Sequence, residues 1–373
     1  MSEPDYYDIV RQKLTLGPLR APPHPKIFEL LKIFWDQETI KVLSYFPPVG
    51  SDISIKELAE KTGMDRKVIK KLLNNAAKKR TIAKSGNKYS LEPLVPGIFE
   101  AYFIVRADTQ ENLIKAAEIY RFLFKNILSP PVFDTNFTLF RPLLPTSATE
   151  KIIQVDATIQ PQEQVMPYEL VEDLINKRES FAVIPCQCRL IGELSGEPCE
   201  IASSDMGCLV TGPAAEIMAN FGWAKLLTKE EALEYLKETE KAGLVHCASN
   251  SRGGEHLAFI CNCCPCHCGA LGPTKQFKIN VVTPSNFRPQ IDYDKCKICK
   301  TCVKKCPMEA ITYSESTEPQ INFNPDVCIG CGICAYNCPT DAIALVKISN
   351  KIPPKINKIG NKIFAQMLSE LLS

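Results

Sequence analysis

Two short cysteine runs in the last third of the chain have the spacing of a metal-cluster site. In each run the pattern is Cys-x2-Cys-x2-Cys-x3-Cys-Pro, and the second run follows the first after 32 residues. The cysteines are Cys296, Cys299, Cys302 and Cys306 in the first run and Cys328, Cys331, Cys334 and Cys338 in the second. Zinc also binds four thiolates, but three cysteines spaced this closely suit a cubane better than one tetrahedral ion. The spacing therefore predicts two iron–sulfur clusters.

The flanks of the two runs repeat as well. IDYDKC precedes the first run and INFNPDVC the second, and each run is followed by an Ala-Ile pair, so each half predicts a strand, a ligand loop, a short helix and a strand. Residues 291–346 thus resemble bacterial two-cluster ferredoxins. The resemblance implies two [4Fe–4S] clusters, each with three cysteines from one run and the fourth from the other. One cluster would bind Cys296, Cys299, Cys302 and Cys338, and the other Cys328, Cys331, Cys334 and Cys306.

The two ligand loops differ in one respect. The second loop contains Gly330 and Gly332, whereas the first has Ile298 and Lys300 at the matching positions. Glycine lets backbone N–H groups approach cluster sulfurs, and such hydrogen bonds tune the potential. We expect the two clusters to differ in potential.

Ten further cysteines between residues 181 and 268 are absent from a simple ferredoxin. Residues 181–185 predict a buried strand that leads into Cys186 and Cys188, which would face the same side in extended backbone. Cys199 and Cys208 follow on loops and would complete four ligands, for a cluster or for zinc. Arg189 would offset the negative charge of such a centre, or simply lie at the surface.

A denser run follows two predicted strands, 244–247 and 256–260, and a helix that a Thr228–Glu231 capping box opens and Gly243 ends. The run consists of Cys261, Cys263, Cys264, Cys266 and Cys268. Metal binding is the simplest explanation for this density, with iron favoured over zinc, but adjacent residues cannot all reach one cubane. Of the nearby histidines His246, His256 and His267, the last is the best candidate ligand.

The segment with CQCR, GLVH, ICNCCPC and SNF resembles multi-cluster ferredoxin-type proteins of anaerobes. This resemblance implies one or two extra metal centres, further Fe–S clusters or zinc, and no defined substrate.

The first hundred residues predict a different kind of domain. Residues 27–46 predict an amphipathic helix, a Ser54–Glu57 capping box opens a second helix ending at Gly63, and Asp65 caps a third over 66–79. Residues 81–91 predict a hairpin. The string LAEKTGMDRKVIKKLL resembles winged-helix domains.

The third helix would be the recognition helix of such a domain. Residues 26–91 hold 14 basic and 7 acidic side chains, so this surface could bind phosphates. The candidate DNA or docking residues are Arg66, Lys67, Lys70 and Lys71. Winged helices also dimerise and dock proteins, and we favour docking or a homodimer over DNA.

Composition narrows the remaining choices. The 373 residues include 44 basic and 42 acidic side chains, so no global charge favours nucleic acid or membranes. The polar start MSEPDYYDIV is unlike a signal peptide, and no apolar run reaches the roughly 18 residues of a membrane helix. We therefore expect 18 reduced, largely metal-bound cysteines in the cytoplasm of an anaerobe.

The predicted architecture is multidomain α+β. Its parts are a tail (1–25), a winged helix (26–97), a helical connecting region (98–180), a cysteine-rich metal-binding α/β domain (181–284), a (βαβ)2 two-cluster ferredoxin domain (285–347) and an amphipathic helix (348–373).

Three functions fit these parts. We favour an electron-transfer subunit that passes low-potential electrons through its clusters to a partner redox enzyme, because no flavin or nucleotide loop supports a self-contained enzyme. The alternatives are a redox-responsive winged-helix transcription regulator and a reductase with an active-site cluster in the middle domain.

Overall fold

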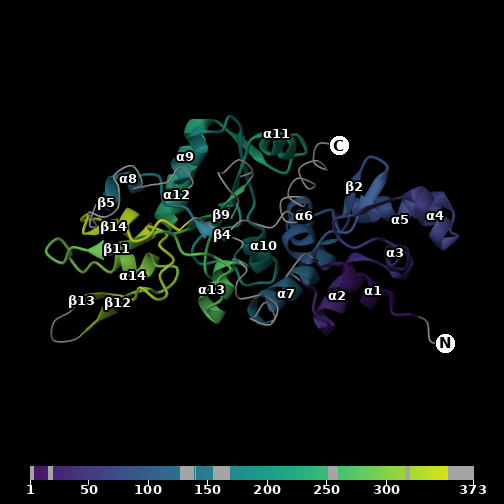
Figure 1. The fold of residues 1–373 in the computed structure, drawn as a ribbon, viewed down its shortest axis with the longest axis horizontal. Coiled ribbons are helices and arrows are strands. Elements are labelled where there is room, and N and C mark those ends of the chain that lie inside the picture. The colour runs from purple at the N-terminus through teal and green to yellow at the C-terminus, as the bar shows by residue number, and fades with distance from the viewer. Residues whose placement is uncertain are drawn as a thin grey trace. The chain divides into compact units, whose positions relative to one another are not determined.

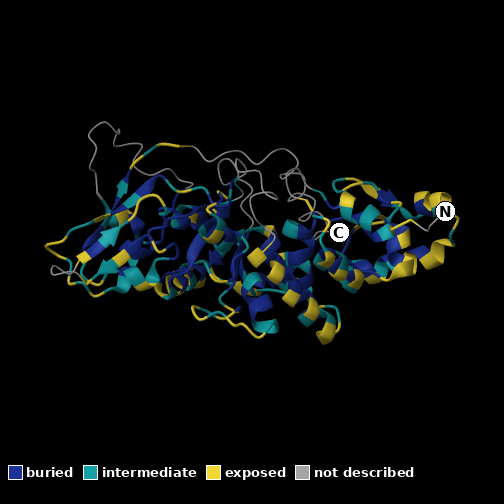
Figure 2. Cartoon of the chain, turned by 90° about the horizontal axis from the view of Figure 1, so that it is seen from below, coloured by how far each residue is buried: buried dark blue, intermediate teal, exposed yellow. Residues whose placement is uncertain are grey.

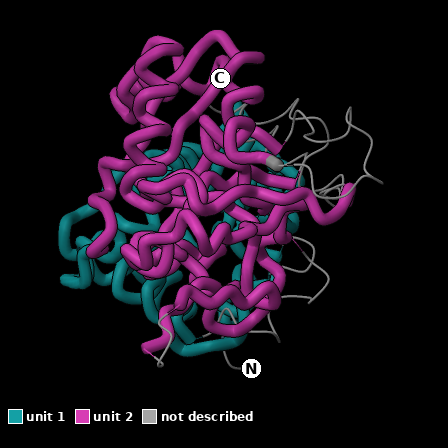
Figure 3. Tube along the Cα trace, turned by 90° about the vertical axis from the view of Figure 1, so that its left-hand side faces the viewer, with its two compact units in different colours: residues 1–134, 187–198, 356–373 teal, residues 135–186, 199–355 magenta. Residues whose placement is uncertain are grey.

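The computed structural model describes residues 4–15, 20–126, 138, 140–153, 169–250, 259–315 and 320–351. His256 and most of the helix predicted over 348–373 lie outside these ranges. The described chain forms two compact units (Figure 3). Unit 1 contains the described parts of 1–134 together with 187–198, and unit 2 contains those of 135–186 and 199–355.

Unit 1 is mainly helical, with one small sheet (Figure 1). Its helices are α1 (Tyr6–Lys13), α2 (Pro25–Phe34), α3 (Gln37–Leu43), α4 (Ile55–Thr62), α5 (Arg66–Lys78), α6 (Phe99–Val105), α7 (Gln110–Asn126) and α10 (Gln187–Leu194), with a short turn η1 at Leu94–Ile98. Strands β1 (Asp52–Ser54), β2 (Ala83–Ser85) and β3 (Lys88–Ser90) form an antiparallel sheet in the order β1-β3-β2.

The predicted helix ends in this unit are confirmed. The Ser54–Glu57 capping box is present on α4, and Gly63 ends that helix with φ +71°. Asp65 accepts hydrogen bonds from the first turn of α5. The predicted hairpin is formed by β2 and β3. These signals are local, which is why the sequence shows them.

The single helix predicted over 27–46 is wrong. The chain leaves the helix at Trp35, and Asp36 caps α3 by accepting from the Thr39 N–H at 2.8 Å. The Trp35 indole is buried, and its N–H donates to Thr81 Oγ at 2.9 Å. An apolar repeat of helical period continues across such a break, so periodicity alone does not reveal it.

Unit 2 contains a six-stranded antiparallel sheet in the order β4-β9-β10-β7-β6-β8. The strands are β4 (Phe140–Pro142), β6 (Phe181–Ile184), β7 (Cys208–Thr211), β8 (Lys225–Leu227), β9 (Val245–Ser249) and β10 (Phe259–Cys263). The helices that accompany it are α9 (Val171–Asn176), α11 (Pro213–Asn220), α12 (Lys229–Ala242) and α13 (Leu271–Phe277), whereas α8 (Ala148–Lys151) packs on residues 287–347. Buried residues concentrate along its strands (Figure 2).

Helix α12 begins and ends as predicted. The Thr228–Glu231 capping box is formed, and Gly243 closes the helix with φ +95°. Strand β9 overlaps the strand predicted over 244–247. Strand β10 continues past the predicted end at 260 to include Cys261 and Cys263, and residues 256–258 of that prediction lie outside the described ranges.

Residues 287–347 form the predicted strand, loop, helix and strand in each half. The first half contains β11 (Phe287–Ile291), α14 (Thr301–Lys305) and β12 (Ile311–Ser314), and the second β13 (Gln320–Phe323), α15 (Ile333–Tyr336) and β14 (Ile343–Lys347). The first strand of each half pairs with the last strand of the other, β11 with β14 and β13 with β12. Strand β5 (Ile152–Ile153) extends the larger pair in parallel to β14.

Among the described helices, none combines the length and the apolar character that a membrane crossing needs.

Gly330 offers a test of this packing. A Cβ at Gly330 would lie 2.3 Å from Phe287 O and from Ser285 Oγ, in addition to the strain of φ +68°. Gly222 has a similar φ of +73° but open space around it. We expect Gly222→Ala to cost about 1–2 kcal/mol and Gly330→Ala clearly more, because only the latter must also displace backbone. Thermal unfolding under anaerobic conditions measures both, and equal shifts of the midpoint would contradict the steric explanation.

Candidate metal centres

The eight ferredoxin-type cysteines surround two hollows in unit 2. Cys296, Cys299, Cys302 and Cys338 line one small hollow, and Cys306, Cys328, Cys331 and Cys334 line the other. Each set combines three cysteines from one run with the fourth from the other, as the resemblance implies.

The two ligand loops follow the same backbone path despite their different sequences. Ile298 and Lys300 adopt left-handed conformations with φ +54° and +60°, where the second loop has Gly330 and Gly332 at +68° and +75°. The glycines are therefore not needed for a different loop shape. Gly330 is needed for space, as its contact with Phe287 shows.

Backbone N–H groups already point at several sulfurs. Ala310 N–H donates to Cys306 Sγ at 3.2 Å, and the equivalent Ala342 N–H donates to Cys338 Sγ at 3.3 Å. Gly330 N–H donates to Cys328 Sγ at 3.3 Å. Such bonds stabilise thiolate charge and favour cluster reduction.

Burial and charge distinguish the two hollows. Cys299 is exposed, and hydrogen bonds from Thr301 hold the pKa of its thiol below the usual range. Cys331 and Cys334 are buried, and burial raises the pKa of both thiols. In the second hollow burial raises the pKa of the Cys328 thiol, and the nearby positive charge of Arg288 opposes this shift. The first hollow is thus the more open at Cys299, and the second has an adjacent cation.

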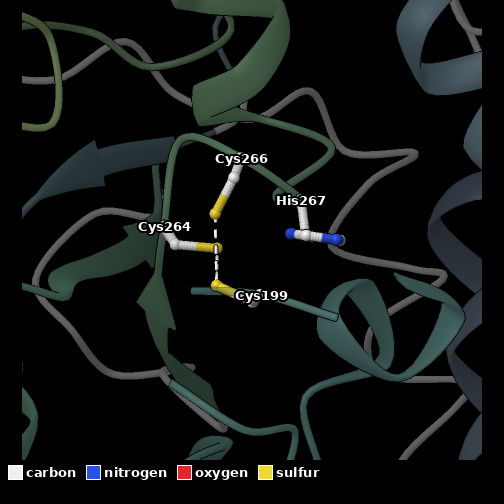
Figure 4. Close-up of side chains that lie close together, drawn as sticks. All are labelled: Cys199, Cys264, Cys266 and His267. Atoms are coloured by element: carbon white, nitrogen blue, oxygen red, sulfur yellow. Dashed lines mark hydrogen bonds between the residues drawn. The ribbon is translucent and has the colours of Figure 1, made fainter. Parts of the chain in front are cut away.

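A separate group lies where β10 leads into α13. The ligand atoms of Cys199, Cys264, Cys266 and His267 all lie within 4.8 Å of one another. Cys199 Sγ is 3.7 Å from Cys264 Sγ and 3.1 Å from Cys266 Sγ, with the His267 ring beside them (Figure 4). A tetrahedral zinc ion with bonds of about 2.3 Å to sulfur separates its thiolates by about 3.8 Å. Three sulfurs and an imidazole at these distances suit one metal ion, whereas the ligands of a cubane are held further apart by the cluster.

The electrostatics of this group favour an anion at Cys199. Hydrogen bonds from Cys264 and Cys266, with smaller effects from His267 and the Ala202 N–H, lower the pKa of the Cys199 thiol. The same bonds raise the pKa of Cys264. A cation bound among these sulfurs would favour the thiolate form of all three.

The structure places Cys199 beside Cys264, Cys266 and His267, which the sequence did not predict. Strand β6 ends at Ile184, and Gln187 begins α10, so Cys186 and Cys188 do not face one side of an extended strand. Cys188 lies in α10 and packs on the apolar core of unit 1. Cys186 belongs to unit 2, where its N–H donates to Ser204 O at 2.7 Å. Cys208 begins β7, opposite Ile184.

Arg189 is also placed differently from expectation. It is fully buried in α10 of unit 1, so it is not a surface arginine. Cys199 and Cys264 lie close together although they are 65 residues apart in the chain, so no local sequence pattern predicts their contact.

The basic residues of α5 are accessible. Arg66, Lys67, Lys70 and Lys71 are exposed, and Val68 between them is 44% exposed. Ile69 and Leu73 bury the opposite side of the helix. The helix therefore presents a basic surface with one apolar residue.

Residues 295–342 match the family model of the 4Fe-4S dicluster domain. No curated protein matches the chain. The chain therefore contains a C-terminal ferredoxin-type domain, and its cysteine content supports iron–sulfur clusters and a role in electron transfer.

The Cys199 group gives a prediction about metal content. Changing Cys199 and Cys266 to serine should remove about one metal ion per chain and leave acid-labile sulfide unchanged, because a single ion contains no inorganic sulfide. Metal and sulfide analysis of anaerobically purified protein measures both. Cys188→Ser serves as the control, since Cys188 packs on the core of unit 1. A loss of about four irons and four sulfides would instead identify an extra cubane.

Proposed function

We propose that this chain is an electron-transfer protein in which two [4Fe–4S] clusters pass low-potential electrons to a partner redox enzyme. One cluster binds Cys296, Cys299, Cys302 and Cys338, and the other binds Cys328, Cys331, Cys334 and Cys306. The observation that supports this most is the exchange of the fourth cysteine between the two hollows. This exchange fixes both clusters within one small fold, which favours transfer between them.

The differences between the two hollows indicate which cluster a redox partner would contact. Cys299 is exposed, so the first cluster lies closest to solvent on that side and is the better point of contact for a partner. The second cluster is held partly by the buried thiols of Cys331 and Cys334, and Arg288 lies near Cys328. A positive charge stabilises the more negative reduced state and so raises the potential of the cluster next to it.

The Cys199 group has a different role in this proposal. Its distances favour one ion bound by Cys199, Cys264, Cys266 and His267, and a Cys3His set is common in structural zinc sites. Zinc has no redox chemistry, so this centre would stabilise the cysteine-rich domain rather than conduct. A zinc ion here would also mean that these four residues hold no iron with a free coordination position, which the reductase alternative requires.

A second candidate function rests on α5. The order of helices, strand and hairpin in residues 26–97 supports a winged helix, and α5 exposes four basic side chains. This surface supports a redox-responsive DNA-binding regulator as the alternative, or docking on an acidic partner.

Arg288 allows the electron-transfer proposal to be tested cluster by cluster. Arg288→Gln should lower the potential of the second cluster by some tens of millivolts, because about 1 kcal/mol of charge stabilisation corresponds to about 40 mV for one electron. The first cluster should be unaffected. An anaerobic redox titration followed by electron paramagnetic resonance measures both potentials, and iron and sulfide should total about eight each for the two clusters.

Two further variants identify which cluster responds. Cys306→Ala should disrupt the second cluster and Cys338→Ala the first. The effect of Arg288→Gln should therefore persist in Cys338→Ala and disappear in Cys306→Ala. The reverse pattern would refute the ligand assignment, and the absence of any reversible low-potential signal in the unchanged protein would refute electron transfer.

The exposed helix gives a separate prediction. If the chain binds DNA, changing Lys67, Lys70 and Lys71 to glutamine should weaken binding and reduce its salt dependence by about two to three phosphate contacts. Changing Lys56 and Lys61 on α4 provides the control on a neighbouring helix. Fluorescence anisotropy over a salt series makes the comparison. If the α4 and α5 variants weaken binding equally, or if the unchanged protein does not bind DNA at low salt, the DNA-binding role of α5 is refuted and protein docking remains.

A further inference from the structure

The two halves of the ferredoxin-type domain differ in charge around their ligand loops. Residues 292–305, which contain the first loop and α14, include five lysines and two aspartates. The equivalent residues 324–337 include one aspartate and no basic residue. Lys295 pairs with Asp292 at 3.2 Å, and Lys305 donates to the end of α12. The other three lysines are a local concentration of positive charge in a chain that is nearly neutral as a whole.

The second ligand loop is covered by other parts of the chain. Ile329 is only 3% exposed, and its carbonyl accepts from the Ser285 N–H at 2.9 Å. Ser285 Oγ donates to Gly330 O at 2.6 Å, and a Cβ at Gly332 would lie 2.8 Å from Pro145 Cδ. Segments from outside the repeat thus pack directly on this uncharged loop, so it offers no free surface to a partner.

The first ligand loop is open at the matching positions. Lys297 and Cys299 are exposed, and Lys297 and Lys300 line the first hollow together with its four cysteines. Lys304 N–H donates to Lys300 O at 3.0 Å, so the exposed Lys304 lies one helical turn further along, on the same side of α14. We call Lys297, Cys299, Lys300 and Lys304 the Cys299 surface.

The positive charge of this surface is largely unpaired within the chain. Among the ion pairs of the described residues, none includes Lys297 or Lys304. Lys300 Nζ lies 3.5 Å from the centre of the Tyr313 ring and 4.0 Å from Glu315, whose side chain is 81% exposed. An exposed pair at that distance contributes little. The three lysines therefore remain available to carboxylates of another protein.

We propose that the Cys299 surface is the docking site for an acidic redox protein, which presents carboxylates to Lys297, Lys300 and Lys304 and takes electrons from the first cluster. This inference rests on the electron-transfer role proposed above. One electron passes between the two proteins in each encounter, and no bond forms or breaks. Complementary charge raises the association rate and fixes the orientation in which Cys299 faces the partner.

Small charged oxidants test the field of this surface. The full-length protein is reduced anaerobically and mixed by stopped flow with tris(oxalato)cobaltate(III), a trianion, or tris(ethylenediamine)cobalt(III), a trication. Each takes one electron and becomes Co(II). Changing Lys297 and Lys304 to glutamine should slow the reaction with the anion several-fold and speed that with the cation, and added salt should reduce both effects. A change of both rates in the same direction would indicate an altered cluster potential and would overturn the proposal.

A matched pair of lysines elsewhere in unit 2 provides the control. Lys177 and Lys225 are exposed, and neither lines a hollow. Changing both to glutamine removes the same charge and should leave both rates unchanged. If the two double variants behave alike, only net charge matters, and a docking site at Cys299 is refuted.

Binding of a protein gives a readout that does not depend on electron flow. Flavodoxin, an acidic electron-transfer protein, serves as the probe, and isothermal titration calorimetry at low salt measures its affinity. Changing Lys297 and Lys304 to glutamine should weaken binding about tenfold, as expected for two exposed charge pairs, whereas the control pair should not. No binding to the unchanged protein, or equal affinity of both variants, would overturn the docking site. An intact low-potential resonance signal in that case would leave electron transfer standing, and only loss of that signal in the unchanged protein would refute it.

Discussion

The buried carboxylate of Glu240 is the interaction on which unit 2 most depends. It is fully buried near the end of α12 and accepts from the N–H and the hydroxyl of Thr146 at 2.7 and 2.8 Å. Its Oε1 also lies 2.8 Å from His246 Nε2. A buried carboxylate is tolerated only when such partners satisfy it, and removing one leaves an uncompensated group. Glu240 thereby joins a helix, the loop after β4 and the central strand pair.

The same end of α12 also holds both halves of the ferredoxin domain. Lys305 Nζ donates to Lys241 O and Ala242 O at 2.8 and 3.0 Å, and Asn337 Nδ2 donates to Glu240 O at 2.9 Å. Lys305 and Asn337 occupy equivalent positions of the repeat, 32 residues apart, and each directly precedes the cysteine that crosses to the other hollow. The free carbonyls at a helix end accept such donors readily. The cysteine-rich domain thus fixes the two residues next to the crossing ligands.

The helix starts and the ferredoxin repeat could be predicted from the sequence because local patterns determine them. Capping residues such as Ser54, Asp65 and Thr228 mark helix starts because their side chains bond the next turn. The ferredoxin repeat was predictable because its ligands lie within a few residues of each other and recur. The break at Asp36 escaped prediction because periodicity continues across it.

The grouping of cysteines in the middle domain was not predicted, for a different reason. Cys188 lies in the first turn of a helix instead of continuing a strand, and Cys199 lies beside cysteines far along the chain. Only the register of β9 and β10 places Cys247 opposite Cys261. Strand pairing is a long-range property, and a shift of one residue would put Cys247 on the other face.

The two kinds of cysteine site differ in the group that they can bind. In the ferredoxin hollows the thiols surround a space, as a cluster requires, whereas in the middle domain they contact one another, as ligands of one ion do. An ion bound by the Cys199 group would therefore not extend the electron path and would instead stabilise the chain where β10 ends. The sheet that contains β10 is joined through His246 and Glu240 to α12, and the end of α12 binds the residues that precede Cys306 and Cys338.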